Sequence, residues 1–220
     1  MTTEQRILFI RHGETVGNLE QIAHGQTESP LNQRGIAQAQ ATGKEISAWD
    51  CRFDKIYTSP LSRAKDTGSI IKEKLGIPLE VVEGLIEGFL GILENATYQE
   101  LGEFGFGTKS LKDDDFSEHK GESPTQLGDR IFRTVERIRD SHPGGNLIIV
   151  SHGAAIAHYL AKALKTRPAF GHQYLMHNAG ITELSFDGIN HPELVLLNQY
   201  KHLPVELQSD PLRRDQHVPE

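Results

Sequence analysis

The sequence has 220 residues, of which 37% are hydrophobic and 24% are charged, and this balance is typical of a globular protein with a sizeable core. Its net charge of −7 argues against a general binder of nucleic acid or of anionic membranes. The single cysteine, Cys51, excludes an internal disulfide framework and a multi-cysteine metal site. The N-terminus has no signal-peptide core, and no apolar run could span a bilayer, so we expect a cytoplasmic protein.

The first predicted element is a strand over residues 7–10, four apolar residues that lead directly into Arg11 and His12. A similar apolar run, residues 147–150, leads into a second His-Gly pair at His152. Ligands of open α/β sheets bind at the carboxyl ends of the strands. The sequence therefore predicts that two imidazoles meet at one sheet edge.

Between and after these two strands, the hydrophobic pattern alternates between helical and strand periods. Residues 18–33 have little periodicity and predict a loop. Further strands are predicted over residues 53–58, 79–82, 178–186 and 192–199, the last two joined by a turn at 187–190. Helices are predicted over residues 34–49, 59–75, 98–104, 127–140 and 154–164.

Two of these helices have specific sequence signals. In the helix over 34–49, Ile36, Ala39 and Ile46 are the apolar positions expected to face the core. In the helix over 59–75, Ser59 suits the N-cap and Pro60 the first helical position.

The alternation predicts an α/β fold, a three-layer α/β/α sandwich with a mostly parallel central sheet. No repeat or linker divides the chain, so we expect one catalytic domain over residues 1–206. Within it, residues 88–125 lose any sustained period and predict a variable lid or insertion. Residues 207–220 predict a polar, loosely held C-terminal tail.

Four cationic or potentially cationic side chains occupy comparable positions at the ends of these elements: Arg11, His12, Arg63 and His152. Such a cluster would repel itself without an anion, and arginine and a helix N-terminus both suit phosphate. No metal-ligand spacing, nucleotide-binding loop or serine-nucleophile motif accompanies it. These residues predict a metal-free phosphate site with a histidine nucleophile, and a carboxylic acid is still needed for the leaving group.

The motifs of the chain closely resemble those of the histidine phosphatase superfamily, the branch that contains cofactor-dependent phosphoglycerate mutases and their phosphatase relatives. The matching segments are Arg11-His12-Gly13-Glu14-Thr15 with Asn18, Ser29-Pro30-Leu31-Asn32-Gln33-Arg34-Gly35, Ser59-Pro60-Leu61-Ser62-Arg63-Ala64, Gly121-Glu122-Ser123, Ser151-His152-Gly153, and Asn198 with His202-Leu203. They span nearly the whole chain, in order.

The resemblance implies specific roles. His12 would be the nucleophile that becomes phosphorylated, and Arg11, Arg63 and His152 would complete the phosphate pocket, with Asn18 as a polar contributor. Glu87 lies where the family keeps its general acid. From the residues alone, Glu83 and Glu94 compete with Glu87 for that role.

Other residues near the motifs have simpler interpretations. Glu14 and Thr15 would order the loop after the nucleophile, and Ser62 would be a first-turn helix residue. His24 would lie near the mouth of the site, facing either substrate or solvent, and His158 would be structural or on the surface. We interpret His172, His177 and His191 in the same way as His158.

Two departures from the family pattern fall in substrate-contacting regions. The segment Gly91–Asn95 lacks an aromatic residue and a second glycine, and an arginine common before Gly25 is absent. The acidic run at residues 113–115 also lies in the insertion, which suits a small polyanion poorly.

The sequence therefore favours a phosphatase that needs no cofactor and hydrolyses a small phosphorylated metabolite. A bisphosphoglycerate-dependent phosphoglycerate mutase is the main alternative, and a non-catalytic phosphate-binding module is a third. Action on a phosphoprotein and assembly into a homodimer are left open.

Overall fold

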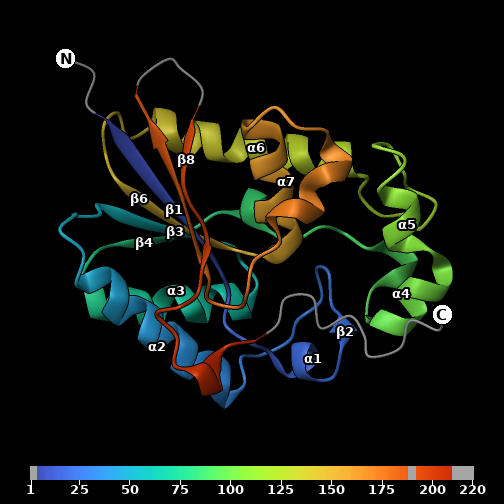
Figure 1. The fold of residues 1–220 in the computed structure, drawn as a ribbon, viewed down its shortest axis with the longest axis horizontal. Helices are drawn as coiled ribbons and strands as arrows, with labels where there is room; N and C mark the ends of the chain where they lie inside the picture. The colour runs from blue at the N-terminus through green and yellow to red at the C-terminus, as the bar shows by residue number, and fades with distance from the viewer. Residues whose placement is uncertain (1–3, 188–191, 210–220) are drawn as a thin grey trace.

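The computed structural model describes residues 4–187 and 192–209. Its centre is a six-stranded sheet, with helices packed on both faces (Figure 1). Across the sheet, the strands lie in the order β4 (Leu79–Val81), β3 (Lys55–Thr58), β6 (Leu147–Ser151), β1 (Gln5–Arg11), β7 (Ile181–Phe186) and β8 (Glu193–Gln199).

Strands β4, β3, β6 and β1 run parallel, whereas β7 is antiparallel to β1 and β8 is antiparallel to β7. Helices α2 (Gln33–Ser47) and α3 (Ser62–Leu75) cover one face of the sheet. Helices α6 (Pro124–Asp140) and α7 (Gly153–Ala163) cover the other face. The predicted three-layer α/β/α architecture with a mostly parallel sheet is confirmed.

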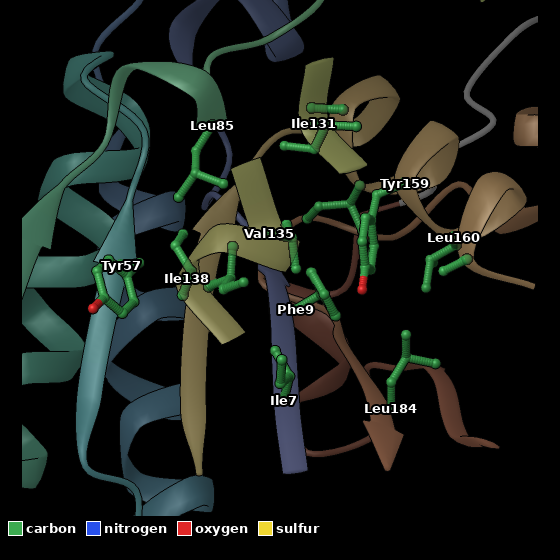
Figure 2. Packing of buried hydrophobic residues seen from close by; sticks show 14 of the residues in the cluster. Ile7, Phe9, Tyr57, Leu85, Ile131, Val135, Ile138, Tyr159, Leu160 and Leu184 are labelled. Atoms are coloured by element: carbon green, nitrogen blue, oxygen red, sulfur yellow. The ribbon is translucent and has the colours of Figure 1, made fainter. Parts of the chain in front are cut away.

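The central strand β1 is apolar on both sides, and this places it between two hydrophobic clusters. Ile7 and Phe9 belong to the cluster under α6 and α7, and Leu8 and Ile10 belong to the one under α2 and α3. Figure 2 shows Phe9 beside Tyr159 of α7, with ring centroids 4.7 Å apart. Because both faces of β1 are buried, its uninterrupted apolar run suits the sheet centre.

The predicted loop over residues 18–33 is wrong in part. It contains the end of α1 (Val16–Leu19) and a short strand, β2 (Ile22–Ala23), which pairs with β5 (Ala96–Thr97). Elements of two to four residues have too little sequence for a period to show. This small sheet ties the loop after β1 to the insertion.

The predicted helix over 34–49 is present, but its buried face differs from the prediction. Ala39 and Ile46 are buried, whereas Ile36 is 40% exposed. The buried stripe instead includes Gln38 and Thr42: Gln38 donates to Leu207 O, and Thr42 hydrogen-bonds to Ala179 O and His202 Nε2.

The predicted cap of the next helix is also wrong. Helix α3 begins at Ser62, its N-cap is Leu61, and the cap has no side-chain hydrogen bond. Ser59 lies upstream of the helix, and its hydroxyl contacts His152. The helix does end as predicted, with Gly76 in the left-handed conformation that favours glycine.

The predicted insertion is an ordered hairpin of short helices at one side of the molecule (Figure 1). The helix predicted over 98–104 is present as α4 (Tyr98–Phe104), and α5 (Phe106–Ser110) follows it. Short 3₁₀ segments, η1 (Glu83–Leu85) and η2 (Gly91–Leu93), lead into the insertion. We call residues 88–125 the lid.

The predicted C-terminal tail starts with ordered residues, since residues 207–209 contact the domain. After η3 (Pro168–Tyr174) and strands β7 and β8, the 3₁₀ segment η4 (Val205–Leu207) packs on α2. Gln38 Nε2 donates to Leu207 O at 2.7 Å. The remaining tail, 210–220, and most of the predicted turn at 187–190 lie outside the described residues.

The domain boundaries stay predictions. Within residues 4–187 and 192–209, no helix is both long enough and apolar enough to cross a membrane.

Candidate active site

The two His-Gly segments meet at the carboxyl edge of the sheet, as predicted. Strand β1 pairs with β6 in a register that places Arg11 beside Ser151. His12 N donates to Ser151 O at 3.0 Å, and the rings of His12 and His152 lie 5.2 Å apart. Both imidazoles are buried.

The glycine after His12 is required by a close backbone approach. A Cβ on Gly13 would lie 2.4 Å from Gly35 O, and a Cβ on Gly35 would lie 2.1 Å from Glu14 O. No side chain fits between these backbones. The loop after β1 therefore packs directly on the first turn of α2.

His12 is held in one tautomer. Its Nδ1 lies 2.7 Å from Gly13 O, which can only accept a hydrogen bond, so Nδ1 carries the proton and Nε2 keeps its lone pair. The pKa of His12 lies well below its ordinary value because burial, Arg63 and Arg11 all disfavour an imidazolium. A neutral imidazole with a free Nε2 is the form that can act as a nucleophile.

His152 is fixed from both sides. Arg63 Nε donates to its Nδ1 at 3.2 Å, so Nε2 carries the proton and donates to Ser59 Oγ at 2.7 Å. Burial, Arg63 and His12 lower the pKa of His152 well below its ordinary value. Ser59 is thus a site residue that sequence reasoning misassigned as a helix cap.

Arg63 and Arg11 differ in how many of their N–H groups already donate hydrogen bonds within the protein. Arg63, 4% exposed, donates to Thr27 O at 2.8 Å and to Gly25 O at 2.6 Å, so it also holds the loop after β2. Arg11 donates from Nη1 to Met176 O at 2.6 Å. Its Nε is buried without a hydrogen-bond partner among the described residues, and it lines the same cavity as His12.

The side chain of Glu87, which follows η1 in the chain, reaches the N-terminus of helix α7. Its carboxylate accepts hydrogen bonds from Ala154 N at 3.1 Å and Ala155 N at 2.8 Å. Arg130, which sequence reasoning missed, donates to Glu87 O at 3.1 Å and holds the loop that carries it. The carboxylate lines the cavity with His12.

The two competing carboxylates lie elsewhere. Glu94 accepts backbone hydrogen bonds from Gln26, Thr27 and Leu90, so it anchors two loops to each other. Glu83 is exposed on η1 and does not line the cavity.

Asn18 joins the site through a second asparagine that the sequence did not single out. Asn178 Nδ2 donates to Asn18 Oδ1 and to His12 O, each at 3.1 Å. Ser209 Oγ donates in turn to Asn178 Oδ1 at 3.2 Å. The chain after β8 therefore helps to hold the nucleophile loop.

The loop residues behave as predicted. Thr15 caps α1, and Glu14 accepts from Asn32 and Arg34. Ser62 begins α3 and donates to Glu28. His24 lines the cavity and also contacts Asn95.

The cavity next to His12 measures about 240 Å³ and extends from the phosphate-site residues to the lid. Its far wall includes Phe106, Phe116, His119 and His158, none of which was predicted as a site residue. His158, interpreted from sequence as structural, belongs to this wall. The lid has no periodic pattern that could have marked Phe106, Phe116 and His119 as wall residues. Within residues 4–187 and 192–209, no three His, Cys, Asp or Glu side chains gather as a metal site.

The chain is similar in sequence and fold to known proteins. Residues 7–200 match the model of the histidine phosphatase superfamily (branch 1). The chain is 35% identical over 150 residues to the uncharacterized phosphatase PhoE of Bacillus subtilis (strain 168), covering 68% of this chain and 72% of that one. It is 35% identical over 156 residues to phosphoglycerate mutase-like protein 4 of Arabidopsis thaliana, covering 68% and 67%.

Among solved structures, the phosphoserine phosphatase of Entamoeba histolytica in complex with 3-phosphoglyceric acid superimposes with a TM-score of 0.81. It is 29% identical and covers 91% of this chain and 100% of that one. The chain described here belongs to the histidine phosphatase superfamily. It is a phosphatase-class enzyme of that family, and this overturns the hypothesis of a non-catalytic module.

Proposed function

We propose that the protein is a metal-independent phosphatase that hydrolyses a small phosphomonoester through a phosphohistidine on His12. The observation that carries this proposal is the state of His12. The ring is buried and neutral, and its one proton stays on Nδ1, where it is donated to Gly13 O. Nε2 is then the nucleophile. Arg11 and Arg63 balance the charge of the phosphoryl group, the task that a metal ion performs in other phosphatases.

In the first step, His12 Nε2 forms a bond to phosphorus while the bond from phosphorus to the leaving oxygen breaks. Glu87 donates a proton to that oxygen. In the second step, water attacks phosphorus, Glu87 takes its proton, and the P–N bond breaks to restore neutral His12. His152 accepts from Arg63 Nε and so positions Arg63 beside the transferring group, and Asn18 contributes a polar side chain to the cavity.

The mutase alternative is supported by the relative named as phosphoglycerate mutase-like. A mutase must shield its phosphohistidine from water and rebind a carboxylate-bearing product. Among the described residues that line the cavity, the arginine and lysine side chains are Arg11 and Arg63 alone, and both lie next to His12 in the proposed phosphate site. This charge distribution favours hydrolysis of a phosphomonoester.

The test is hydrolysis of p-nitrophenyl phosphate by the purified protein in the presence of EDTA. We expect full activity with EDTA and none with His12→Ala. Activity that requires added metal would contradict the proposed mechanism. Interconversion of phosphoglycerates that depends on bisphosphoglycerate would establish the mutase instead.

A further inference from the structure

We propose that the enzyme selects phosphomonoesters whose leaving group is uncharged and mainly apolar, such as an aromatic or branched aliphatic alcohol. The lid wall of the cavity would bind that group. This inference rests on the proposed function, and it names the substrate class of the same site.

The described residues give the lid end of the cavity no lysine or arginine for a second anionic group. Among the described residues that line it, Arg11 and Arg63 are the only arginine or lysine side chains, and three donors of Arg63 are already engaged. Lys109 of the lid forms an ion pair with Glu118 and does not line the cavity. A substrate carboxylate would therefore be desolvated there without a partner, which is unfavourable.

The cavity's second carboxylate is also engaged. Glu122 forms an ion pair with Arg130, with Nε and Oε1 2.7 Å apart, and it accepts a hydrogen bond from Phe89 N. Its charge is balanced by Arg130. An ammonium group on the substrate would thus compete with an existing ion pair, so this wall does not select a charged leaving group of either sign.

Four aromatic and aliphatic side chains form much of the wall at the lid end of the cavity, beside polar groups such as Tyr98 and Ser110. Phe106 of α5 and Phe116 contact each other with ring centroids 6.0 Å apart, and Leu101 of α4 and Leu127 of α6 lie on the same cavity. Apolar groups on the substrate gain free energy by leaving water for such a wall. Three of these four residues belong to the lid.

Two histidines in this wall do not supply positive charge. His119 is 1% exposed and lies between Phe106 and Phe116, at ring-centroid distances of 5.0 and 5.4 Å. Burial lowers the pKa of His119, and it lowers the pKa of His158 to about 4. Both are neutral rings near neutral pH, so they bring no positive charge to this wall.

The test compares benzyl phosphate with 3-phosphoglycerate, because both release a primary alkoxide and differ mainly in charge and apolar surface. We expect kcat/KM for benzyl phosphate to exceed that for 3-phosphoglycerate at least about tenfold. Phe106→Ala should lower kcat/KM for benzyl phosphate about tenfold and change the value for 3-phosphoglycerate less than about twofold.

Two further variants complete the test. Phe170→Ala removes the same side chain from η3, at a position that does not line the cavity, so it should change kcat/KM for neither substrate more than about twofold. Leu101→Arg places a cation on the wall and should reduce the preference for benzyl phosphate at least about fivefold. This variant keeps the lid aromatics, so it tests the inference even where Phe106→Ala unfolds.

An equal or higher kcat/KM for 3-phosphoglycerate, with activity lost in His12→Ala, would overturn the substrate class and leave the proposed function in place. An unchanged preference in Leu101→Arg, with the variant folded, would also overturn the substrate class. Absence of any His12-dependent hydrolysis would overturn both.

Discussion

The two ends of the cavity are built in different ways. At the phosphate end, backbone carbonyls and hydroxyls fix each catalytic group: Gly13 O orients His12, and Ser59 with Arg63 orients His152. At the lid end, aromatic rings pack on each other and few directional bonds fix them. In the proposed mechanism, the first end sets which bond is broken, and the second end sets which leaving group is accepted.

Replacing the nucleophile should give the largest effect and should do so for every substrate. His12→Ala removes the atom that bonds to phosphorus, so we expect kcat to fall at least about 10³-fold. The measurement is steady-state hydrolysis of p-nitrophenyl and benzyl phosphates. The matched control is His172→Ala, since His172 is exposed and away from the cavity. Activity of His12→Ala on one of the two substrates would break the separation of the two ends.

The next largest effect should depend on the leaving group. Glu87→Gln cannot donate a proton, so kcat for benzyl phosphate should fall about 10²-fold, whereas p-nitrophenolate leaves unaided and should lose less than about tenfold. Glu83→Gln, an exposed carboxylate on η1, is the control. Equal slowing of the two substrates would reassign the acid.

A change of pH should test the lid end through stability. The pKa of His158 is about 4 in the folded protein, whereas an unfolded histidine titrates near 6.5, so the unfolded chain binds more protons between these values. The free energy of unfolding therefore keeps its full value, as far as His158 is concerned, above pH 6.5. It falls as the pH drops from 6.5 toward 4. Between pH 7.5 and 5, His158 alone should lower the free energy of unfolding by roughly 2 kcal/mol.

Urea unfolding at the two pH values measures this loss. The His158→Gln variant should lose that much less stability than the wild type, and His172→Gln should behave as the wild type. A wild-type pH dependence retained in full by His158→Gln would show that His158 is not held neutral.

The smallest effect should come from Ser59, which acts through His152. Ser59→Ala removes the acceptor of the His152 Nε2 proton, so we expect kcat/KM to fall roughly tenfold for every phosphomonoester. Ser59→Thr keeps a hydroxyl and should restore most of the loss. NMR of the imidazole nitrogens reads the His152 tautomer directly, and an unaltered tautomer population in Ser59→Ala would contradict this positioning role.

The contrast between the phosphate end and the lid end of the cavity also explains which residues could be predicted from the sequence. His12 and His152 follow apolar strands that pair in the sheet, so a local pattern was enough to bring them together. Ser59 was misassigned because Ser-Pro is a local capping signal, whereas its actual partner is 93 positions away. Ile36 was placed on the core face because it is apolar, yet polar Gln38 is buried instead, since its side chain binds the C-terminal segment.

The lid end could not be predicted for a related reason. Phe106, Phe116 and His119 form a cluster without any helical or strand period, because short segments of different direction bring them together. Arg130 donates to the carbonyl of Glu87 and Asn178 donates to the carbonyl of His12, and backbone acceptors of this kind leave no mark in the sequence pattern.

The central claim is that His12 Nε2 carries the phosphoryl group during turnover. Rapid acid-free quenching of the enzyme with p-nitrophenyl phosphate, followed by peptide mass spectrometry and phosphorus NMR, measures this directly. We expect a phosphoryl group on Nε2 of His12 that forms and decays at rates consistent with kcat. Turnover without it, or with phosphate on His152 or another residue, would contradict the account.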